Sequence, residues 1–146
     1  MRRQIFMLTA LALVACSEPA DTRVGQPVTH RRAAFKKILL AFEPMGVQLR
    51  NKQYDANQFI VLAKTLVQMR NGPWSYFGAD TNYPPSQARA KVWSEPGQFE
   101  VDRQGFLQAT EHLLLAAESR DEKQVTMAYE AVHDSCRNCH KDFKGQ

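Results

Sequence analysis

Four stretches of this chain carry apolar residues at intervals of three and four, the spacing of one face of an α-helix. They cover residues 28–49, 59–69, 99–116 and 121–143, and Asp121 is a helix N-cap residue at the start of the last one. Helices with one apolar face each must bury those faces against one another. We therefore expect an all-α fold, an antiparallel four-helix bundle in one domain.

The links between the expected helices differ in length. Residues 51–55 form a short polar break between the first two helices, and the third helix leads into the fourth after a few residues. Residues 72–97 are rich in proline and glycine, which is typical of a connection and not of an element interior. The sequence thus predicts one long crossover between the second and third helices.

The last expected helix contains the sequence Cys136-Arg137-Asn138-Cys139-His140. Two thiols three positions apart, followed directly by an imidazole, are typical of a c-type haem attachment site. Cys136 and Cys139 would bind the two vinyl groups, and His140 would ligate the iron. The apolar register of this helix places both thiols on its core side, so the porphyrin would lie between helices of the bundle.

A redox disulfide and a zinc site are the two rival interpretations of the Cys-x-x-Cys spacing. A structural zinc site usually needs four protein ligands. The remaining histidines, His30, His112 and His133, are scattered singly along the chain and are expected to be surface or helix-face residues. Covalent haem is the better interpretation.

Residues 1–15 have the features of a bacterial signal peptide: two arginines precede an apolar run that is too short to remain as a membrane-spanning helix. The run ends in Leu-Val-Ala-Cys, which resembles the lipobox of bacterial lipoproteins and predicts lipidation of Cys16. Ordinary cleavage after Ala15, leaving a free thiol, is the alternative. Ser17 after the cysteine resembles the sorting pattern for the outer membrane.

Lipid on Cys16 would anchor the protein to a membrane in the periplasm. Residues 16–27 are polar and contain proline and glycine, so we expect them to form a flexible tether, with residues 28–146 as the bundle domain. The formal charge of +4 falls when the arginines of the signal peptide are removed. Without a basic stripe interleaved with aromatics, the sequence gives no reason to expect nucleic-acid binding.

Beyond the haem motif, the chain resembles the cytochromes c prime over roughly residues 28–144. The haem motif near the C-terminus is typical of that family, whereas few other c-type cytochromes place it there. The other residues that carry the resemblance are Arg31 followed by Phe35, Tyr54-Asp55-Ala56, Pro73-Trp74 with Phe77-Gly78, Val92-Trp93-Ser94, and Phe99.

The resemblance implies one haem c with His140 as the axial iron ligand and Phe35 in the distal position. Phenylalanine has no lone pair to donate, and low-spin relatives carry methionine at this position. We therefore expect five-coordinate, high-spin iron with a vacant but hindered sixth site. Met45 and Met69 are formal candidates for the sixth ligand and are expected to be core residues instead.

The resemblance also implies further haem contacts. Arg31 would lie near the propionates, where a guanidinium can pair with a carboxylate. Arg32, Thr81 and Asn82 match neighbouring haem contacts by position. Lys144 stands in the proximal pocket where the family often has arginine, and its ammonium lacks the planar guanidinium fork.

A vacant site lined by an aromatic side chain favours nitric oxide and carbon monoxide, because bound dioxygen depends more on a hydrogen-bond donor. We therefore expect capture or buffering of nitric oxide, with periplasmic electron transfer as the alternative. Nothing near Phe35 in the sequence supplies the acid–base group that catalysis would need, so we do not expect an enzyme. The family commonly forms homodimers, which is the expected assembly here.

Overall fold

The computed structural model describes residues 19–145. The signal peptide and Cys16 lie outside the described residues, so their assignments stay predictions. The four expected helices are present, and the crossover adds two short ones. The elements in chain order are α1 (Pro27–Arg50), α2 (Ala56–Met69), the 3-10 helix η1 (Trp74–Tyr76), α3 (Lys91–Ser94), α4 (Pro96–Ser119) and α5 (Glu122–Phe143).

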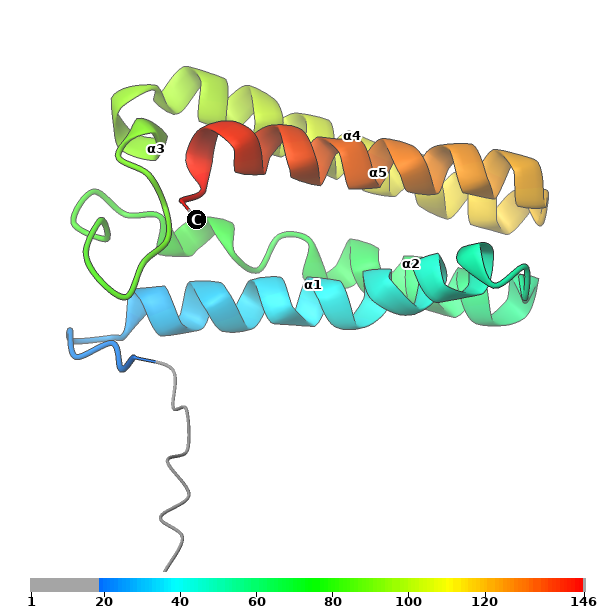
Figure 1. Cartoon of the computed structure of the whole chain (residues 1–146), viewed down its shortest axis with the longest axis horizontal. Helices are drawn as coiled ribbons and strands as arrows, with labels where there is room; N and C mark the ends of the chain where they lie inside the picture. The colour runs from blue at the N-terminus through cyan, green and yellow to red at the C-terminus, as the bar shows by residue number, and fades with distance from the viewer. Residues whose placement is uncertain (1–18, 146) are drawn as a thin grey trace, which may run out of the picture.

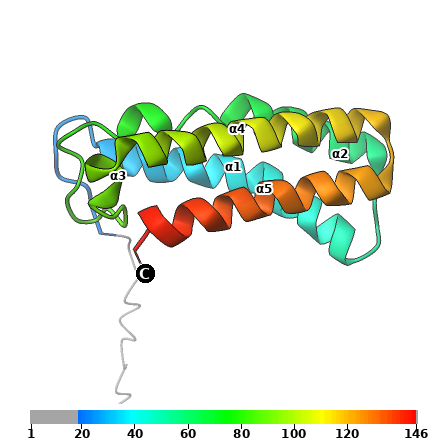
Figure 2. The ribbon, with the colours of Figure 1, turned by 90° about the horizontal axis from the view of Figure 1, so that it is seen from above.

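The four long helices form a bundle in which α1 packs on α2, α2 on α4 and α4 on α5. The crossover, with η1 and α3, lies at one end of the bundle, and the turns α1–α2 and α4–α5 lie at the other (Figures 1 and 2). The helices α1 and α5 close the ring but approach each other over a much shorter length than the other neighbours do. The bundle is thus tightly packed on three sides and more open between α1 and α5.

Aspartates begin two of the helices. The carboxylate of Asp55 accepts hydrogen bonds from the backbone N–H groups of Asn57 and Gln58, and Asp121 caps α5 in the same way. Such caps satisfy N–H groups that have no partner inside the helix. The predicted start of α5 is confirmed, whereas α4 begins at Pro96, three residues before the first apolar position of its stripe.

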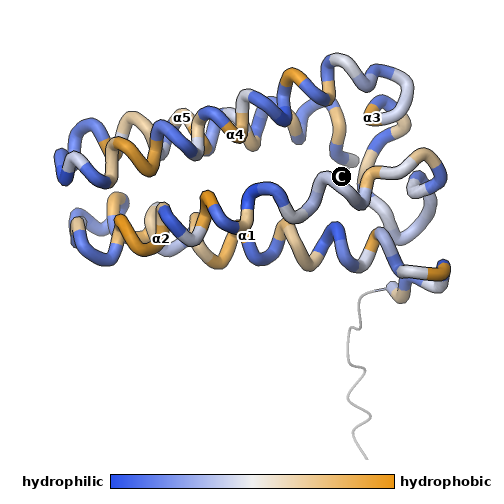
Figure 3. The backbone as a smooth tube through the Cα atoms, turned by 180° about the vertical axis from the view of Figure 1, so that it is seen from behind, coloured by the Kyte–Doolittle hydropathy of each residue, from blue (hydrophilic) through white to orange (hydrophobic). Residues whose placement is uncertain are grey.

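Hydrophobic and hydrophilic residues alternate along each long helix, as expected for helices with one buried face (Figure 3). All four helices contribute to a single core. Its fully buried side chains include Met45 of α1, Phe59 and Leu66 of α2, Leu113 of α4, and Val125 and Val132 of α5.

The segment before α1 is packed against the bundle. Asp21 is 2% exposed, and its carboxylate accepts hydrogen bonds from the N–H groups of Val28 and Thr29, in the first turn of α1, and from the hydroxyl of Tyr83 in the crossover. The expected flexible tether therefore does not extend to Pro27, because the buried Asp21 fastens the chain six residues earlier. None of the described helices combines the length and apolarity needed to span a bilayer.

Candidate haem site

Both thiols of the haem motif lie on the last turns of α5 and are unpaired and half-buried. Cys136 packs against the core. Burial raises the pKa of Cys136, and burial together with the negative charges of Asp102 and Asp142 raises the pKa of Cys139 to about 12. Both groups are therefore neutral thiols at pH 7, in a setting that suits an apolar thioether.

His140 lies next to the second thiol and lines a surface hollow of about 580 Å³ along the end of α5. Partial burial lowers the pKa of His140, and the ammonium of Lys144 lowers it further. The imidazole is therefore neutral at pH 7 and has a nitrogen lone pair available for a metal ion.

The contact between α1 and α5 lies away from the haem motif. The ring of Phe42 stacks on Tyr129 at 4.5 Å between centroids, and Gly46 lies directly against the Tyr129 hydroxyl. Both positions are in the second half of α1, and Tyr129 is in the first half of α5. The halves of the two helices that carry Arg31 and Cys136 are those nearer the crossover.

A group of aromatic rings occupies the crossover end of the bundle. Phe35 of α1 packs edge-on against Trp74 at 5.6 Å and against Phe77 at 6.3 Å between ring centroids. Phe77 contacts Phe99 at 5.0 Å, and Phe99 contacts Phe143 at the end of α5 at 5.2 Å. An apolar, ring-lined surface therefore extends from Phe35 to the helix that carries the thiols.

Arg31 is a buried cation, and the oxygens that accept its hydrogen bonds are neutral. It is 4% exposed, and its guanidinium donates to the carbonyl of Tyr76 (3.1 Å), the hydroxyl of Thr81 (3.2 Å) and the hydroxyl of Ser86 (2.7 Å), and lies 4.3 Å from the Phe77 ring centroid. Burial lowers the pKa of Arg31, but arginine stays charged. No carboxylate among residues 19–145 forms an ion pair with it. A buried charge of this kind favours an anionic group beside it.

The other residues predicted to contact the haem do not form a single group in the structure. Thr81 is buried and bonds to Arg31, whereas Asn82 is exposed and is not among the partners of Arg31. Arg32 is half-buried. Lys144 is exposed, and its backbone N–H donates to the carbonyl of His140 at 3.1 Å.

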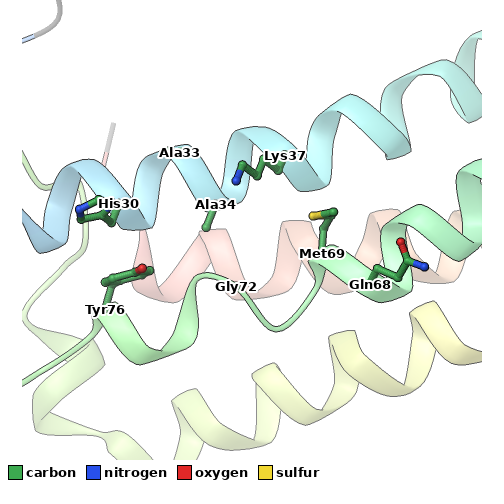
Figure 4. A pocket seen from close by; sticks show the side chains of 8 residues that line it. All are labelled: His30, Ala33, Ala34, Lys37, Gln68, Met69, Gly72 and Tyr76. Atoms are coloured by element: carbon green, nitrogen blue, oxygen red, sulfur yellow. The ribbon is translucent and has the colours of Figure 1, made fainter.

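The two methionines weighed as sixth ligands occupy different surroundings. Met45 is fully buried in the core. Met69 lines a hollow of about 220 Å³ that α1, α2 and η1 enclose together, with Ala34 and Lys37 on the side of α1 (Figure 4). His30 also borders this hollow and stacks on Tyr76 at 5.4 Å.

Sequence reasoning did not identify Tyr76 and Ser86 as partners of Arg31. The carbonyl of Tyr76 could not have been found from side-chain chemistry, because any residue presents one. Ser86 lies in the crossover, and no repeating sequence pattern there predicts that it contacts α1. Both become neighbours of Arg31 only through the path of the crossover.

The residues present fit a haem c. Two neutral thiols and a neutral imidazole lie on one helix, the aromatic rings from Phe35 to Phe143 offer a continuous apolar surface, and the buried Arg31 favours a carboxylate. Among residues 19–145, no group of three or more His, Cys, Asp or Glu side chains could hold a metal ion by itself, so the zinc interpretation has no support in the part of the chain that the structure describes. Fold and site together define a c-type cytochrome built on a four-helix bundle.

Comparison with known proteins gives the family. The profile of the family described as Cytochrome C' matches residues 26–144. Cytochrome c' from Alcaligenes xylosoxydans xylosoxydans is 27% identical over 80% of this chain and 91% of its own length, and cytochrome c' from Cereibacter sphaeroides is 26% identical over 99% of this chain and 98% of its own. The chain belongs to the cytochrome c prime family, whose members bind haem c.

Solved structures agree with this assignment. Cytochrome c prime from Shewanella frigidimarina is 28% identical and superposes with a TM-score of 0.79 over 82% of this chain and 94% of its own. A nitric oxide complex of a single-residue variant of the Alcaligenes xylosoxidans protein is 26% identical, with a TM-score of 0.78 over 83% of this chain and 95% of its own. Another variant of that protein has been solved in the ferrous state with bound nitric oxide.

Proposed function

We propose that this protein binds nitric oxide and carbon monoxide reversibly at a single covalent haem c and captures or buffers nitric oxide. Phe35 carries the proposal: by the resemblance of the sequence to the family, it stands at the helix α1 position over the iron, and it has no atom that could ligate the metal. Two related structures contain nitric oxide, which supports the same activity here.

When bound, the haem supplies an iron with one open coordination position. The chain supplies the rest. Cys136 and Cys139 hold the group covalently, His140 provides a neutral nitrogen ligand, and Arg31 offers a buried cation to a propionate. Phe35 packs against Trp74 and Phe77, so a ligand must displace it and lose part of that packing.

The aromatic surroundings of Phe35 also set the selectivity. Its ring neighbours Trp74 and Phe77 present aromatic faces and edges, and the indole N–H of Trp74 is already donated to the carbonyl of Arg70 at 2.7 Å. A bound dioxygen gains stability from a hydrogen-bond donor, whereas nitric oxide and carbon monoxide need one far less. Selection against dioxygen follows from these contacts.

Gas titration of the ferrous haem protein tests the proposal. Carbon monoxide and nitric oxide should each change the Soret absorption band with a saturable, single-site dependence, and exposure to air should oxidise the iron without a stable dioxygen spectrum. Absence of any spectral response to either gas would overturn gas binding and leave periplasmic electron transfer as the leading function.

Electron transfer is the second candidate, and the exposed end of α5 favours it. His140 lines an open hollow together with Arg137 and Lys141, so the haem motif lies near the surface. A redox partner could approach there without passing through the bundle. Rapid electron exchange with a small redox protein, combined with no response to nitric oxide, would favour this function over gas binding.

We further propose that residues 1–15 direct export, that Cys16 carries lipid, and that the protein is held in the periplasm, on the outer membrane. This rests on the lipobox-like sequence and on Ser17 after the cysteine. Mass spectrometry of the mature N-terminus tests it: acyl chains on Cys16 support the anchor, and a free thiol contradicts it.

We also propose that the protein is a binding protein and not an enzyme.

We also propose that the protein forms a homodimer through α1 and α2. Four large apolar side chains on these helices are exposed: Leu39 (46%), Leu40 (74%) and Val47 (46%) on α1, and Val61 (62%) on α2. Burying them in a second copy removes apolar surface from water. Sedimentation should show a dimer that Leu40→Glu converts to monomer, and a monomeric parent protein would contradict it.

A further inference from the structure

The segment that precedes α1 is fixed to the domain at Asp21. The carboxylate is 2% exposed and accepts four hydrogen bonds, from the N–H groups of Arg23 (3.2 Å), Val28 (2.9 Å) and Thr29 (3.2 Å) and from the hydroxyl of Tyr83 (2.9 Å). Hydrogen bonds to a charged acceptor are stronger than those between neutral groups. The chain therefore joins the bundle at Asp21, not at the start of α1.

Arg23 makes a second attachment to the crossover. Its guanidinium donates to the carbonyl of Asp80 at 3.0 Å and lies 3.9 Å from the centroid of the Tyr83 ring. A cation over an aromatic ring is attracted to the ring face. Together, Asp21 and Arg23 hold residues 21–26 against the crossover.

The end of α5 meets the same crossover. The N–H of Gly145 donates to the carbonyl of Gln87 at 2.7 Å, and the N–H of Arg89 donates to the carbonyl of Phe143 at 2.9 Å. The N-terminal segment, the crossover and the last turn of α5 thus share one end of the bundle (Figures 1 and 2). His140, at the end of the haem motif, belongs to this end.

Chain length then limits the distance between Cys16 and the domain. Four residues separate Cys16 from the fixed Asp21. Five fully extended steps along the chain span at most about 18 Å. The 24 residues of α1 alone extend about 36 Å. A lipid-anchored Cys16 would therefore keep the crossover end closer to the membrane than the opposite end.

The surface of the crossover end suits an anionic bilayer. Val24 is fully exposed in the turn that the Gln26 N–H closes on the Arg23 carbonyl. Arg89, Lys141 and Lys144 are exposed around the junction of the crossover with α5, whereas the carboxylate of Asp142 in the same segment is paired with Lys91 at 3.5 Å. Basic residues near a membrane surface are attracted to anionic headgroups, and an exposed apolar side chain can enter the interface.

We propose that the crossover end, the surface formed by residues 22–26, 87–89 and 141–145, lies on the bilayer that carries the lipid anchor, so that the haem-bearing end of the bundle faces the membrane. This inference rests on the proposed lipidation of Cys16. It deepens the proposed function, because gas or electrons would then be exchanged at the membrane surface and not in the open periplasm.

Hydrogen–deuterium exchange of the full-length haem protein on phosphatidylglycerol-containing vesicles tests the orientation. Mass spectrometry first establishes the acyl chains on Cys16. Relative to the soluble Cys16→Ser protein, peptides covering the crossover end should exchange more slowly on vesicles, and peptides covering the α4–α5 turn should not change. Equal protection at both ends, or protection at the turn alone, would overturn the proposal.

Two altered proteins and one matched control make the test more specific. Val24→Glu should reduce the protection at the crossover end, whereas Leu115→Glu, an exposed position on α4 near the other end, should leave it unchanged. A flexible insertion of about ten Gly and Ser residues before Pro19 should also reduce it, because the tether then no longer limits orientation. Unchanged protection in both the Val24 variant and the insertion would overturn the proposal.

The experiments distinguish a failure of the proposed membrane orientation from a failure of the proposed haem function. A Cys16 without lipid would overturn the anchor and this orientation together, while the gas titration of the ferrous haem protein would still decide the haem function. Lipid on Cys16 without the predicted footprint would overturn only the orientation.

Discussion

Phe35 presents only carbon and hydrogen atoms to its neighbours, and its ring is held edge-on by Trp74 and Phe77. If this side chain lies over the iron, it blocks the sixth position without filling it. A side chain of similar size with a lone pair would then change the coordination state and not merely the access of gases.

Phe35→Met should convert the ferric haem from high spin to low spin, because a thioether sulfur at this position can ligate the iron. Electron paramagnetic resonance of the purified ferric protein measures the change. Phe35→Leu is the matched control and should stay high spin, since leucine has a similar volume and no donor atom. High-spin signals from both variants would show that residue 35 does not face the iron.

The positive charge of Arg31 is expected to affect the reduction potential of the haem. Its guanidinium is buried, and its hydrogen-bond acceptors are the neutral oxygens of Tyr76, Thr81 and Ser86. A fixed cation near the haem stabilises the reduced state, which carries one positive charge fewer than the oxidised state.

Arg31→Met should lower the haem reduction potential by about 50 mV, the size of a roughly tenfold change in a one-electron equilibrium. Arg31→Lys keeps the charge and should shift the potential less. Redox titration followed by absorption measures both, and thermal melts show whether each variant is folded. An unchanged potential in a folded Arg31→Met protein would place Arg31 away from the haem.

The helix pair α1 and α5 meets where a glycine allows close approach. A Cβ at Gly46 would overlap the hydroxyl and the ring carbon Cζ of Tyr129, and that ring is fixed by stacking on Phe42. By contrast, a Cβ at Gly105, inside α4, would meet no atom within 4 Å.

Alanine at these two glycines should therefore have opposite effects on the free energy of unfolding. Gly46→Ala should destabilise the protein by about 1–3 kcal/mol, the usual cost of overpacking. Gly105→Ala should stabilise it by about 0.5–1 kcal/mol, because alanine is the better helix former. Denaturant unfolding followed by circular dichroism measures both, and the same sign for the two variants would contradict the close contact.

The start of α1 depends on a carboxylate outside the helix. Burial raises the pKa of Asp21, but the hydrogen bonds from Tyr83, Arg23, Thr29 and Val28 outweigh it and hold the pKa below the ordinary value of 3.8. A carboxyl whose pKa is lower in the folded state stabilises the fold above its unfolded pKa. That contribution is lost as the pH falls through the folded pKa.

Asp21→Asn should accordingly lower the melting temperature at neutral pH, and the difference from the parent protein should shrink as the pH falls below 3.8. Tyr83→Phe removes one of the four hydrogen bonds and should have a smaller effect at neutral pH. Thermal melts across the acid range measure both. A difference that stays constant down to low pH would show that the charge of Asp21 does not matter.

The long helices could be predicted because each repeats a period over many residues. The cap Asp121 stands directly before its helix and is predicted from the sequence, whereas the cap Asp55 is identified only in the structure. Asp21 could not be predicted, because it caps α1 from six residues before Pro27 and finds Tyr83 only in the folded crossover. The short helices η1 and α3 hold three and four residues, too few to show a period.

At the scale of the whole molecule, three sides of the bundle are closed by helix packing and the fourth, between α1 and α5, makes contact mainly at the end away from the crossover. The haem motif and Phe35 could be named from the sequence because a local motif and a family resemblance mark them. The aromatic surface that joins them draws on α1, the crossover, α4 and α5, so its assembly required the structure.

The measurement that tests the central claim most directly is the electron paramagnetic resonance spectrum of the purified ferric protein at neutral pH, before and after addition of nitric oxide. A vacant sixth position beside Phe35 predicts a high-spin signal that nitric oxide removes. A low-spin signal that the gas leaves unchanged would reveal a protein side chain on the iron and contradict gas binding.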